Sequence, residues 1–250
     1  MAISPLTDSS GVLTLTITCD GAVIPDIIQV VSVEINHSTN RIPSAIITLL
    51  DGDMPNAEFP IADAGNFKPG TLVVINAGYD GTTKMIFTGI VIAHSVKING
   101  DNYARLIIEC RDKALAMTVG RKNANYVNKT DNQIISSLIS NYSGLTPTVD
   151  ATSVTYKELV QYYATDWDYM MARAEVNGFL VTVDAGKVTV KAPDRSGSVV
   201  LKLTYGMDLM EFQAELDSRS QLSSVTSTSW DLSQLAIVQQ SAQAITLTGQ

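Results

Sequence analysis

Short runs in which apolar and polar residues alternate fill the first ~115 positions of the chain. Residues 12–19 place leucine, isoleucine and cysteine on one face and three threonines on the other, and residues 31–35 repeat the pattern. A period of two is typical of strands with one buried face. The remaining strands of this region are expected at 45–50, 72–77, 85–95 and 103–110. Six short strands joined by tight turns, with no helix between them, predict a small barrel or sandwich over residues 1–118.

Helical periodicity replaces this alternation in the middle of the chain. Thr130-Asp131-Asn132-Gln133 has the form of a capping box, and apolar residues follow it at helical spacing. A second helix is expected to begin near Thr165 and to end at Gly178, and two short strands then follow as a hairpin. Residues 119–195 are therefore predicted to form a small α/β unit.

The last part of the chain returns to strand-like runs, at 199–205, 209–217 and 222–230. Three strands cannot close a barrel, so the rest of this β region is either missing from the chain or supplied from elsewhere. Residues 232–250 carry no charged side chain, which suits either a strand that pairs with a neighbour or the start of a further domain. The expected fold is mainly β with an α/β insertion: two small barrel-like domains, 1–118 and an incomplete 196–250, flank the unit 119–195.

Composition agrees with this fold and excludes several kinds of partner. Val, Ile and Thr, which favour strands, make up 69 of the 250 residues. The formal net charge of −8 argues against nucleic acid, because phosphate binding needs clustered Lys and Arg. No apolar run approaches the roughly 18 residues of a membrane helix, and the N-terminus lacks a secretory signal. We expect no stable membrane anchor and folding in a reducing cytoplasm, with Cys19 and Cys110 as buried free thiols.

Few side chains suggest a metal site. His37 and His94 lie on separate expected strands, without acidic or cysteine neighbours at ligand spacing. An acidic turn resembles half of a calcium loop through Asp51, Asp53, Asn56 and Glu58. The spacing fails because Pro55 takes the fifth position of the loop, while its sixth and twelfth positions lack glycine and glutamate. A solvated turn without metal is expected here.

Acidic residues also gather around the second expected helix. Asp166 and Asp168, together with Glu175, are the carboxylates that a hydrolase hypothesis would use. Both aspartates fall in the first helical turn, where free backbone N–H groups favour negative charge. The apolar residues beside them fit a helix face packed on a sheet better than a ligand pocket: Trp167, Met170 and Met171. The sequence thus predicts no catalytic residue, no cofactor and no metal.

Seven segments carry a further signal through their order and spacing. They are CRDKA at 110–114, VNKTDNQII at 127–135, LVQY at 159–162, TDWDY at 165–169, RAEVNG at 173–178, FQAELDSRSQ at 212–221 and SWD at 229–231. Together they resemble the VgrG family, the spike-hub proteins of type VI secretion systems, which are related to phage tail-hub proteins and to extracellular contractile injection systems. The pieces within 165–178 and 212–231 are the most specific.

This resemblance implies a structural hub rather than an enzyme. Family members form homotrimers in which two similar barrels per chain make a pseudo-sixfold ring, and this ring joins a hexameric inner tube to a threefold spike. The implied partners are other copies of the chain, the tube protein, a spike and baseplate proteins. The implied location is the bacterial cytoplasm during assembly, then the baseplate or tip of a phage tail or injection particle, from which the protein is ejected in some systems. Typical members continue into a long spike, whereas this chain stops at Gln250, so the spike is either a separate protein or missing from a fragment.

Two alternatives remain open from the residues alone. An all-β carbohydrate-binding or adhesin module would bind glycans through exposed aromatic side chains, with Trp167 and Trp230 as the only tryptophans. A cell-wall or protein hydrolase would use the carboxylates of Asp166, Asp168 and Glu175. The hub hypothesis ranks first because the family-like segments occur in order.

Overall fold

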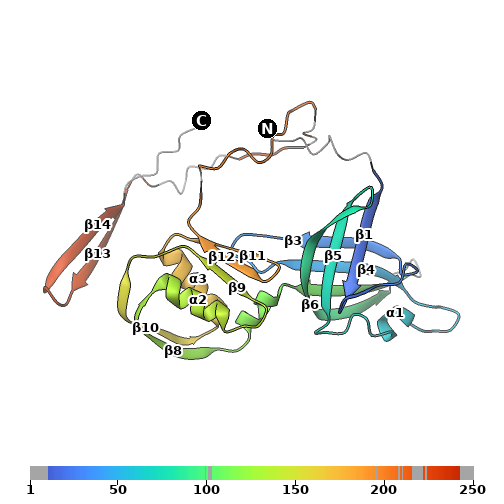
Figure 1. Cartoon of the computed structure of the whole chain (residues 1–250), viewed down its shortest axis with the longest axis horizontal. Coiled ribbons are helices and arrows are strands. Elements are labelled where there is room, and N and C mark those ends of the chain that lie inside the picture. The colour runs from blue at the N-terminus through green and yellow to red at the C-terminus, as the bar shows by residue number, and fades with distance from the viewer. Residues whose placement is uncertain are drawn as a thin grey trace. The chain divides into compact units, whose positions relative to one another are not determined.

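A computed structural model describes residues 11–98, 100, 103–194, 196–207, 209, 211–215, 222 and 224–242. The fold is mainly β, with a few short helices (Figure 1). The chain divides into two compact units, one that extends to Val200 and one that starts at Leu201. The mainly β class predicted from the sequence is confirmed.

Seven antiparallel strands form the first sheet, in the order β2-β1-β5-β6-β7-β4-β3. They are β1 (Leu13–Cys19), β2 (Ala22–Val23), β3 (Val30–Asn36), β4 (Ser44–Asp51), β5 (Leu72–Tyr79), β6 (Thr82–Ile98) and β7 (Ala104–Arg111). The alternation read from the sequence selects the buried face, where Ile17, Ile47, Ile75 and Ile108 pack in one core. A short helix α1 (Pro60–Asp63), absent from the prediction, follows β4.

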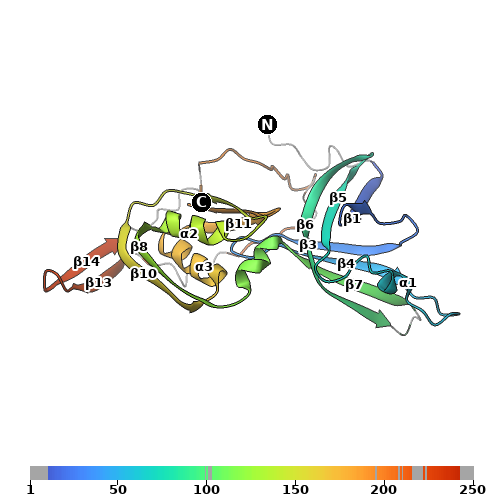
Figure 2. The ribbon, with the colours of Figure 1, turned by 60° about the horizontal axis from the view of Figure 1, so that its bottom comes forward.

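The long strand β6 curls this sheet. Its first half pairs with β5 and its second half with β7, so that Ile90 lies opposite both Leu72 and Arg111. A register shift between Val91 and Ala93 marks the bend, and Figure 2 shows the strands of this sheet curving. Within the described residues the end strands β2 and β3 do not pair with each other, so the sheet stays open. The sequence predicted a small barrel or sandwich here, and the described residues form a curved sheet that does not close into a barrel.

Gly89 is required at this bend because two backbones approach closely there. A Cβ atom at Gly89 would overlap the carbonyl oxygen of Arg111 and lie 2.7 Å from the Phe87 ring. We expect Gly89→Ala to lower the free energy of unfolding by about 1–3 kcal/mol, measured by urea denaturation. The matched control is Gly197→Ala, where a Cβ meets no atom within 4 Å. Equal stability of the two variants would contradict this role for Gly89.

The described α/β part of the same unit has two sheets, two α-helices and a short 3₁₀ helix. Its elements are η2 (Lys113–Thr118), β8 (Lys122–Thr130), α2 (Asp131–Ser140), β9 (Thr146–Val149), β10 (Thr155–Ala164), α3 (Asp166–Val176), β11 (Leu180–Asp184) and β12 (Lys187–Lys191). The strands β11, β12 and β9 form one sheet, with β9 parallel to β12, and β8 pairs with β10 in a separate ribbon. The two predicted helices and the β11–β12 hairpin are confirmed, whereas β8, β9 and β10 escaped the prediction.

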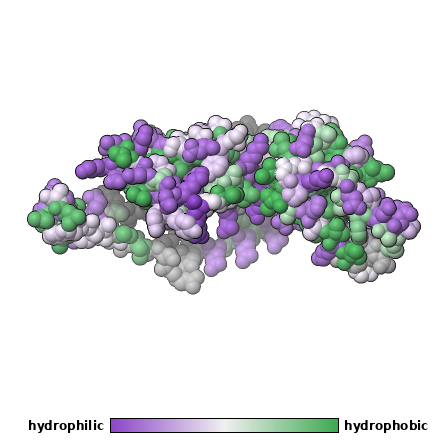
Figure 3. Space-filling model, turned by 90° about the horizontal axis from the view of Figure 1, so that it is seen from below, coloured by the Kyte–Doolittle hydropathy of each residue, from purple (hydrophilic) through white to green (hydrophobic). Residues whose placement is uncertain are grey.

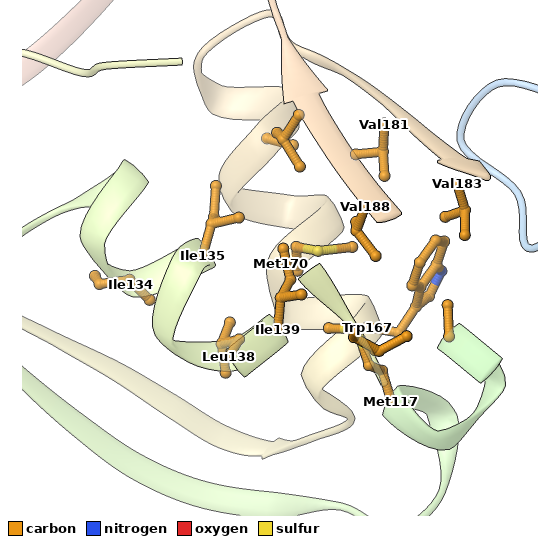
Figure 4. Packing of buried hydrophobic residues seen from close by; sticks show 14 residues of the cluster. Met117, Ile134, Ile135, Leu138, Ile139, Trp167, Met170, Val181, Val183 and Val188 are labelled. Carbon is orange, nitrogen blue, oxygen red and sulfur yellow. The ribbon is translucent and has the colours of Figure 1, made fainter. Parts of the chain in front are cut away.

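Local sequence signals explain the helix boundaries. The Thr130 N–H donates to Gln133 Oε1 at 3.2 Å, as the predicted capping box requires, and Thr165 Oγ1 accepts from the Asp168 N–H at 3.0 Å. The predicted apolar face of α3 packs against α2 and the valines of the β11–β12 hairpin (Figure 4). Its members Trp167, Met170 and Ala174 are buried, and Met171 is half-buried.

In the described residues of the second unit, β13 (Val225–Asp231) and β14 (Ala236–Ala242) form a hairpin. The predicted strand at 222–230 is confirmed over 225–230. The strands predicted at 199–205 and 209–217 do not form in the described residues of these runs, apart from an isolated bridge between Tyr205 and Leu209. Residues 210, 216 and 217 lie outside the described residues. The uncharged end of the chain does contain a strand that pairs, with β13 as its neighbour, and residues 243–250 lie outside the described residues.

Candidate functional site

Asp166 lies in a buried polar network rather than in an open cleft. Its side chain is 1% exposed. Oδ2 accepts from Lys122 Nζ at 2.7 Å and from the Tyr142 hydroxyl at 2.7 Å, and Oδ1 accepts from Gln161 Nε2 at 2.8 Å. Burial opposes ionisation of this carboxyl, but the hydrogen bonds outweigh it and lower the pKa of Asp166. The network ties the start of α3 to β8, β10 and the end of α2.

Asp131 makes a second buried network at the start of α2. Arg173 binds its carboxylate through two nitrogens, Nε at 2.6 Å and Nη2 at 3.0 Å, and Asn177 Nδ2 donates at 2.8 Å. Burial again opposes ionisation, and the donors from Arg173 and Asn177 lower the pKa of Asp131 in spite of it. This bidentate pair fastens α2 to α3.

These two carboxylates predict acid sensitivity. A carboxyl whose pKa is lower in the folded protein contributes stability above its unfolded pKa of about 4, and this stability is lost as the pH falls through the folded pKa. We expect the free energy of unfolding, measured with urea, to fall between pH 6 and pH 3. These limits lie about two units above and about one unit below the unfolded pKa. Asp166→Asn should be less stable at neutral pH and show a shallower acid loss. An acid loss identical to that of the parent would contradict the assignment.

The other carboxylates of the hydrolase hypothesis are not gathered with Asp166. Asp168 is exposed, and its Oδ2 accepts from the Thr165 hydroxyl at 2.7 Å as part of the helix cap. Glu175 is exposed and makes no hydrogen bond to either aspartate among the described residues. The three carboxylates therefore do not form one site, and those of Asp166 and Asp168 stabilise the start of α3.

The acidic turn after β4 is held by backbone donors. Asp51 is buried, and its carboxylate accepts from the N–H groups of Gly52, Ile61 and Ala62 at 2.8–3.0 Å. Asp53 accepts from Asn56 Nδ2 at 2.8 Å, so this part of the turn is closed by its own side chains. The turn borders an open cavity of about 550 Å³ that Glu58 also lines. The expectation of a fully solvated turn is wrong for Asp51, because this carboxylate anchors the start of α1.

The two histidines and the two cysteines lie in or next to the first sheet. His37 meets Phe87 edge to face at 6.4 Å, while His94 Nδ1 lies 3.2 Å from the Phe67 carbonyl oxygen. Within the described ranges, no three His, Cys, Asp or Glu side chains cluster closely enough to hold a metal ion. Cys19 and Cys110 are buried free thiols, as predicted. Burial raises their pKa to about 11 and about 12, so both stay protonated and unreactive.

The exposed edges of the first sheet are the main unpaired surface. β3 pairs only with β4, and β1 pairs with β2 through Thr18 and Cys19 alone, so most of both outer edges is open in the part of the chain described. Apolar side chains stand near these edges, with Leu13 62% exposed and Val31 54% exposed. The face in Figure 3 shows apolar side chains (green) reaching the surface between polar ones (purple). Open edges of this kind template pairing with another chain.

The β13–β14 hairpin is a second exposed surface. Trp230 lies opposite Ile237 in the hairpin register, and both side chains are exposed, Trp230 by 55%. A two-stranded hairpin without a covering surface is marginally stable in water. Only Trp230 remains as an exposed tryptophan for the carbohydrate-binding hypothesis, since Trp167 is 8% exposed. We therefore expect the hairpin to be stabilised by packing against another surface.

The sheet and its α/β neighbour define the fold of phage tail proteins and of a type VI secretion component. The chain is similar to the 43 kDa tail protein of prophage MuSo2 from Shewanella oneidensis, with TM-score 0.65, 14% identity, and 86% of this chain and 63% of that one covered. It is similar to a tail protein from Neisseria meningitidis MC58, with TM-score 0.64, 14% identity, and 94% and 68% covered. The E. coli c3393 protein, a component of the type VI secretion system, gives TM-score 0.54, 14% identity, and 87% and 56% covered. The resemblance stated from the sequence is thus confirmed at the level of the fold.

By sequence, the chain belongs to the family described as Alg8 N-terminal domain, whose model matches residues 9–250. No curated protein matches the chain by sequence. The chain spans 63% of the length of the MuSo2 tail protein. Among the helices that the structure describes, none has both the length and the apolar character to cross a bilayer.

Proposed function

We propose that this protein is a structural component of a contractile phage tail or a related injection apparatus, and that it acts there as a homotrimeric hub. In this role it joins the hexameric inner tube to the threefold spike, as the VgrG-like segments imply. Its partners are other copies of itself, the tube protein, a spike and baseplate proteins. It assembles in the bacterial cytoplasm and then lies at the baseplate or tip of the particle.

The observation that carries this proposal is the fold shared with two tail proteins, one of them from a prophage, over 86% and 94% of the chain. The open edges of β1 and β3 support it, because an assembled ring would cover them. The exposed hairpin supports it in the same way. The engagement of Asp131 and Asp166 in structural networks favours a structural role over hydrolysis.

The proposed division of labour follows the domains expected from the sequence. Residues 1–118 act as the first hub domain, residues 119–195 as the α/β insertion, and residues 196–250 as the second hub domain. The β13–β14 hairpin then supplies two strands of that second domain, and neighbouring chains or further sequence supply the rest. Three chains with two β domains each offer six docking positions for a hexameric tube.

Sedimentation velocity of the purified protein over a range of concentrations tests the proposal. The expected species is a trimer of 26.9 kDa chains, in reversible equilibrium with the monomer at low concentration. Addition of the tube protein of the same genome should yield a larger complex. A protein that stays monomeric at every concentration and ignores the tube protein would overturn the proposal.

A further inference from the structure

A cavity of about 690 Å³ lies where the first sheet adjoins the α/β part of the same compact unit. The loop between β3 and β4 forms one wall, and the end of β7, η2 and α3 contribute the others. Hydrogen bonds tie the loop between β3 and β4 to β11 of the α/β part. The Asn40 N–H donates to the Val181 carbonyl at 2.7 Å, and Asn40 Oδ1 accepts from the Val181 N–H at 2.8 Å. The cavity is therefore a built feature of one unit.

Asp112 fixes the opposite wall next to Arg111. Its buried carboxylate accepts from the Ala114 N–H at 2.8 Å through Oδ1 and from the Gly186 N–H at 3.0 Å through Oδ2. The end of β7 is thereby joined to the turn between β11 and β12. The CRDKA segment at 110–114 thus combines a structural aspartate with an arginine that faces the cavity.

Hydrogen-bond donors without partners dominate the polar lining. Arg41 and Arg111 both line the cavity, and neither guanidinium makes a hydrogen bond or ion pair with any described residue. Among the described residues that line the cavity, none carries a carboxylate. Its two side-chain amide oxygens are engaged, since Asn36 Oδ1 accepts from the Ser38 hydroxyl at 2.6 Å and Asn40 Oδ1 accepts from the Val181 N–H at 2.8 Å, while the hydroxyls of Ser38 and Ser44 can both donate and accept. The cavity thus offers donors and positive charge to whatever enters it.

Arg111 is the more informative of the two arginines because it is half-buried. Partial burial of a guanidinium costs hydration free energy, and a bound anion compensates for this loss. The planar guanidinium matches the two oxygens of a carboxylate. Apolar side chains complete the lining, among them Ile42, Leu115 and Trp167. Figure 4 shows the indole nitrogen of Trp167 on the ring edge turned away from Met170. A ligand with both an acidic and an apolar part would meet all of these groups.

We propose that this cavity binds an acidic segment of a partner protein, with an Asp or Glu carboxylate on Arg111 and Arg41 and an adjacent apolar side chain against Trp167. Charge complementarity carries the choice of partner. The described lining holds two arginines rather than the larger cluster of Lys and Arg that a nucleic-acid backbone needs, and the apolar wall exceeds what a free phosphate ion contacts. The proposal is independent of the hub role, since it concerns one compact unit.

Trp167 fluorescence in a Trp230→Phe background tests the proposal, because Trp167 is then the single tryptophan. The probes are two blocked tetrapeptides, acetyl-Leu-Glu-Leu-Glu-amide and its glutamine counterpart. We expect saturable binding of the glutamate peptide with a dissociation constant below about 1 mM, confirmed by calorimetry, and at least about tenfold weaker binding of the glutamine peptide. Inorganic phosphate and a single-stranded oligonucleotide serve as the competing ligands.

Variants identify the site. Arg111→Gln should weaken binding of the glutamate peptide at least about tenfold, and Arg111→Lys should weaken it less, because lysine keeps the charge but not the fork. Arg121→Gln is the matched control, since Arg121 is exposed, lies outside the cavity and stacks over Tyr163 at 5.1 Å. Circular dichroism checks that each variant folds. The proposal is overturned if the glutamine peptide binds equally well, if phosphate or the oligonucleotide binds more tightly, if no peptide binds, or if Arg121→Gln has the same effect as Arg111→Gln.

Discussion

Replacement of Asp131 by alanine is expected to lower the free energy of unfolding by about 3–5 kcal/mol. The Asp131 carboxylate is 1% exposed, and the Arg173 side chain that grips it with two nitrogens is 14% exposed. The variant leaves the Arg173 guanidinium largely buried without its counter-ion, and it also removes an acceptor from Asn177. Urea denaturation at neutral pH, followed by circular dichroism, measures the loss.

Two controls separate this pair from general effects of charge. Asp184→Ala removes an exposed carboxylate from the same part of the chain and should change stability by no more than about 0.5 kcal/mol. Replacement of both partners, as Asp131→Leu with Arg173→Met, should cost much less than Asp131→Ala alone, because no charge then remains buried. A loss below about 1 kcal/mol for Asp131→Ala would contradict the assigned pair.

Lysine at the two open sheet edges is expected to abolish self-association while leaving the single chain folded. Leu13→Lys charges the outer edge of β1, and Val31→Lys charges β3. Both side chains are exposed, so the stability of the monomer should change by about 0.5 kcal/mol or less. A neighbouring strand that docks on these edges would instead bury an unpaired charge, which is strongly unfavourable. Sedimentation velocity should report a monomer for the double variant.

Val154→Lys is the matched control for the edge variants. Val154 is also an exposed valine, but it lies between β9 and β10 rather than on an open edge of the first sheet. This variant should associate like the parent protein. Retained association of the edge double variant, or equal dissociation of Val154→Lys, would show that the edges do not form the interface.

The elements that the sequence predicts well are those with one buried face. Alternation over residues 12–19 and 31–35 selects β1 and β3, because each has one side toward the core of Ile17 and Ile75. The capping box at Thr130 and the apolar face around Trp167 select the two helices for the same reason. In these elements, local pattern and tertiary burial agree.

The elements that the sequence misses depend on distant partners. β8 reads as Lys-Asn-Ala-Asn-Tyr-Val-Asn-Lys-Thr, with no clear apolar face. Its pairing with β10 joins positions about 30 residues apart, such as Val127 opposite Glu158. Asp51 likewise reads as a turn residue, because its donors at Ile61 and Ala62 come from α1. The candidate cavity at Arg111 also escaped prediction, since its walls come from segments far apart in the sequence. CRDKA at 110–114 was the only local signal for it.

Near the end of the chain the sequence predicts strands that the structure does not contain in its described residues. Apolar runs at 199–205 and 209–217 predict strands, yet the described residues of these runs form none. Their apolar side chains are largely exposed, including Val200, Tyr205 and Phe212. A pattern indicates which side chains favour burial, but the surface that buries them has to come from another part of the structure. In the proposed assembly, neighbouring chains supply that surface.

Electron cryomicroscopy of the associated protein tests the central claim most directly. If copies of this chain cover its open β-sheet edges, the particles will have threefold symmetry, with β1 and β3 at the contacts between subunits. Particles that contain a single chain with both edges exposed to solvent, or an assembly whose contacts leave β1 and β3 uncovered, would contradict the account.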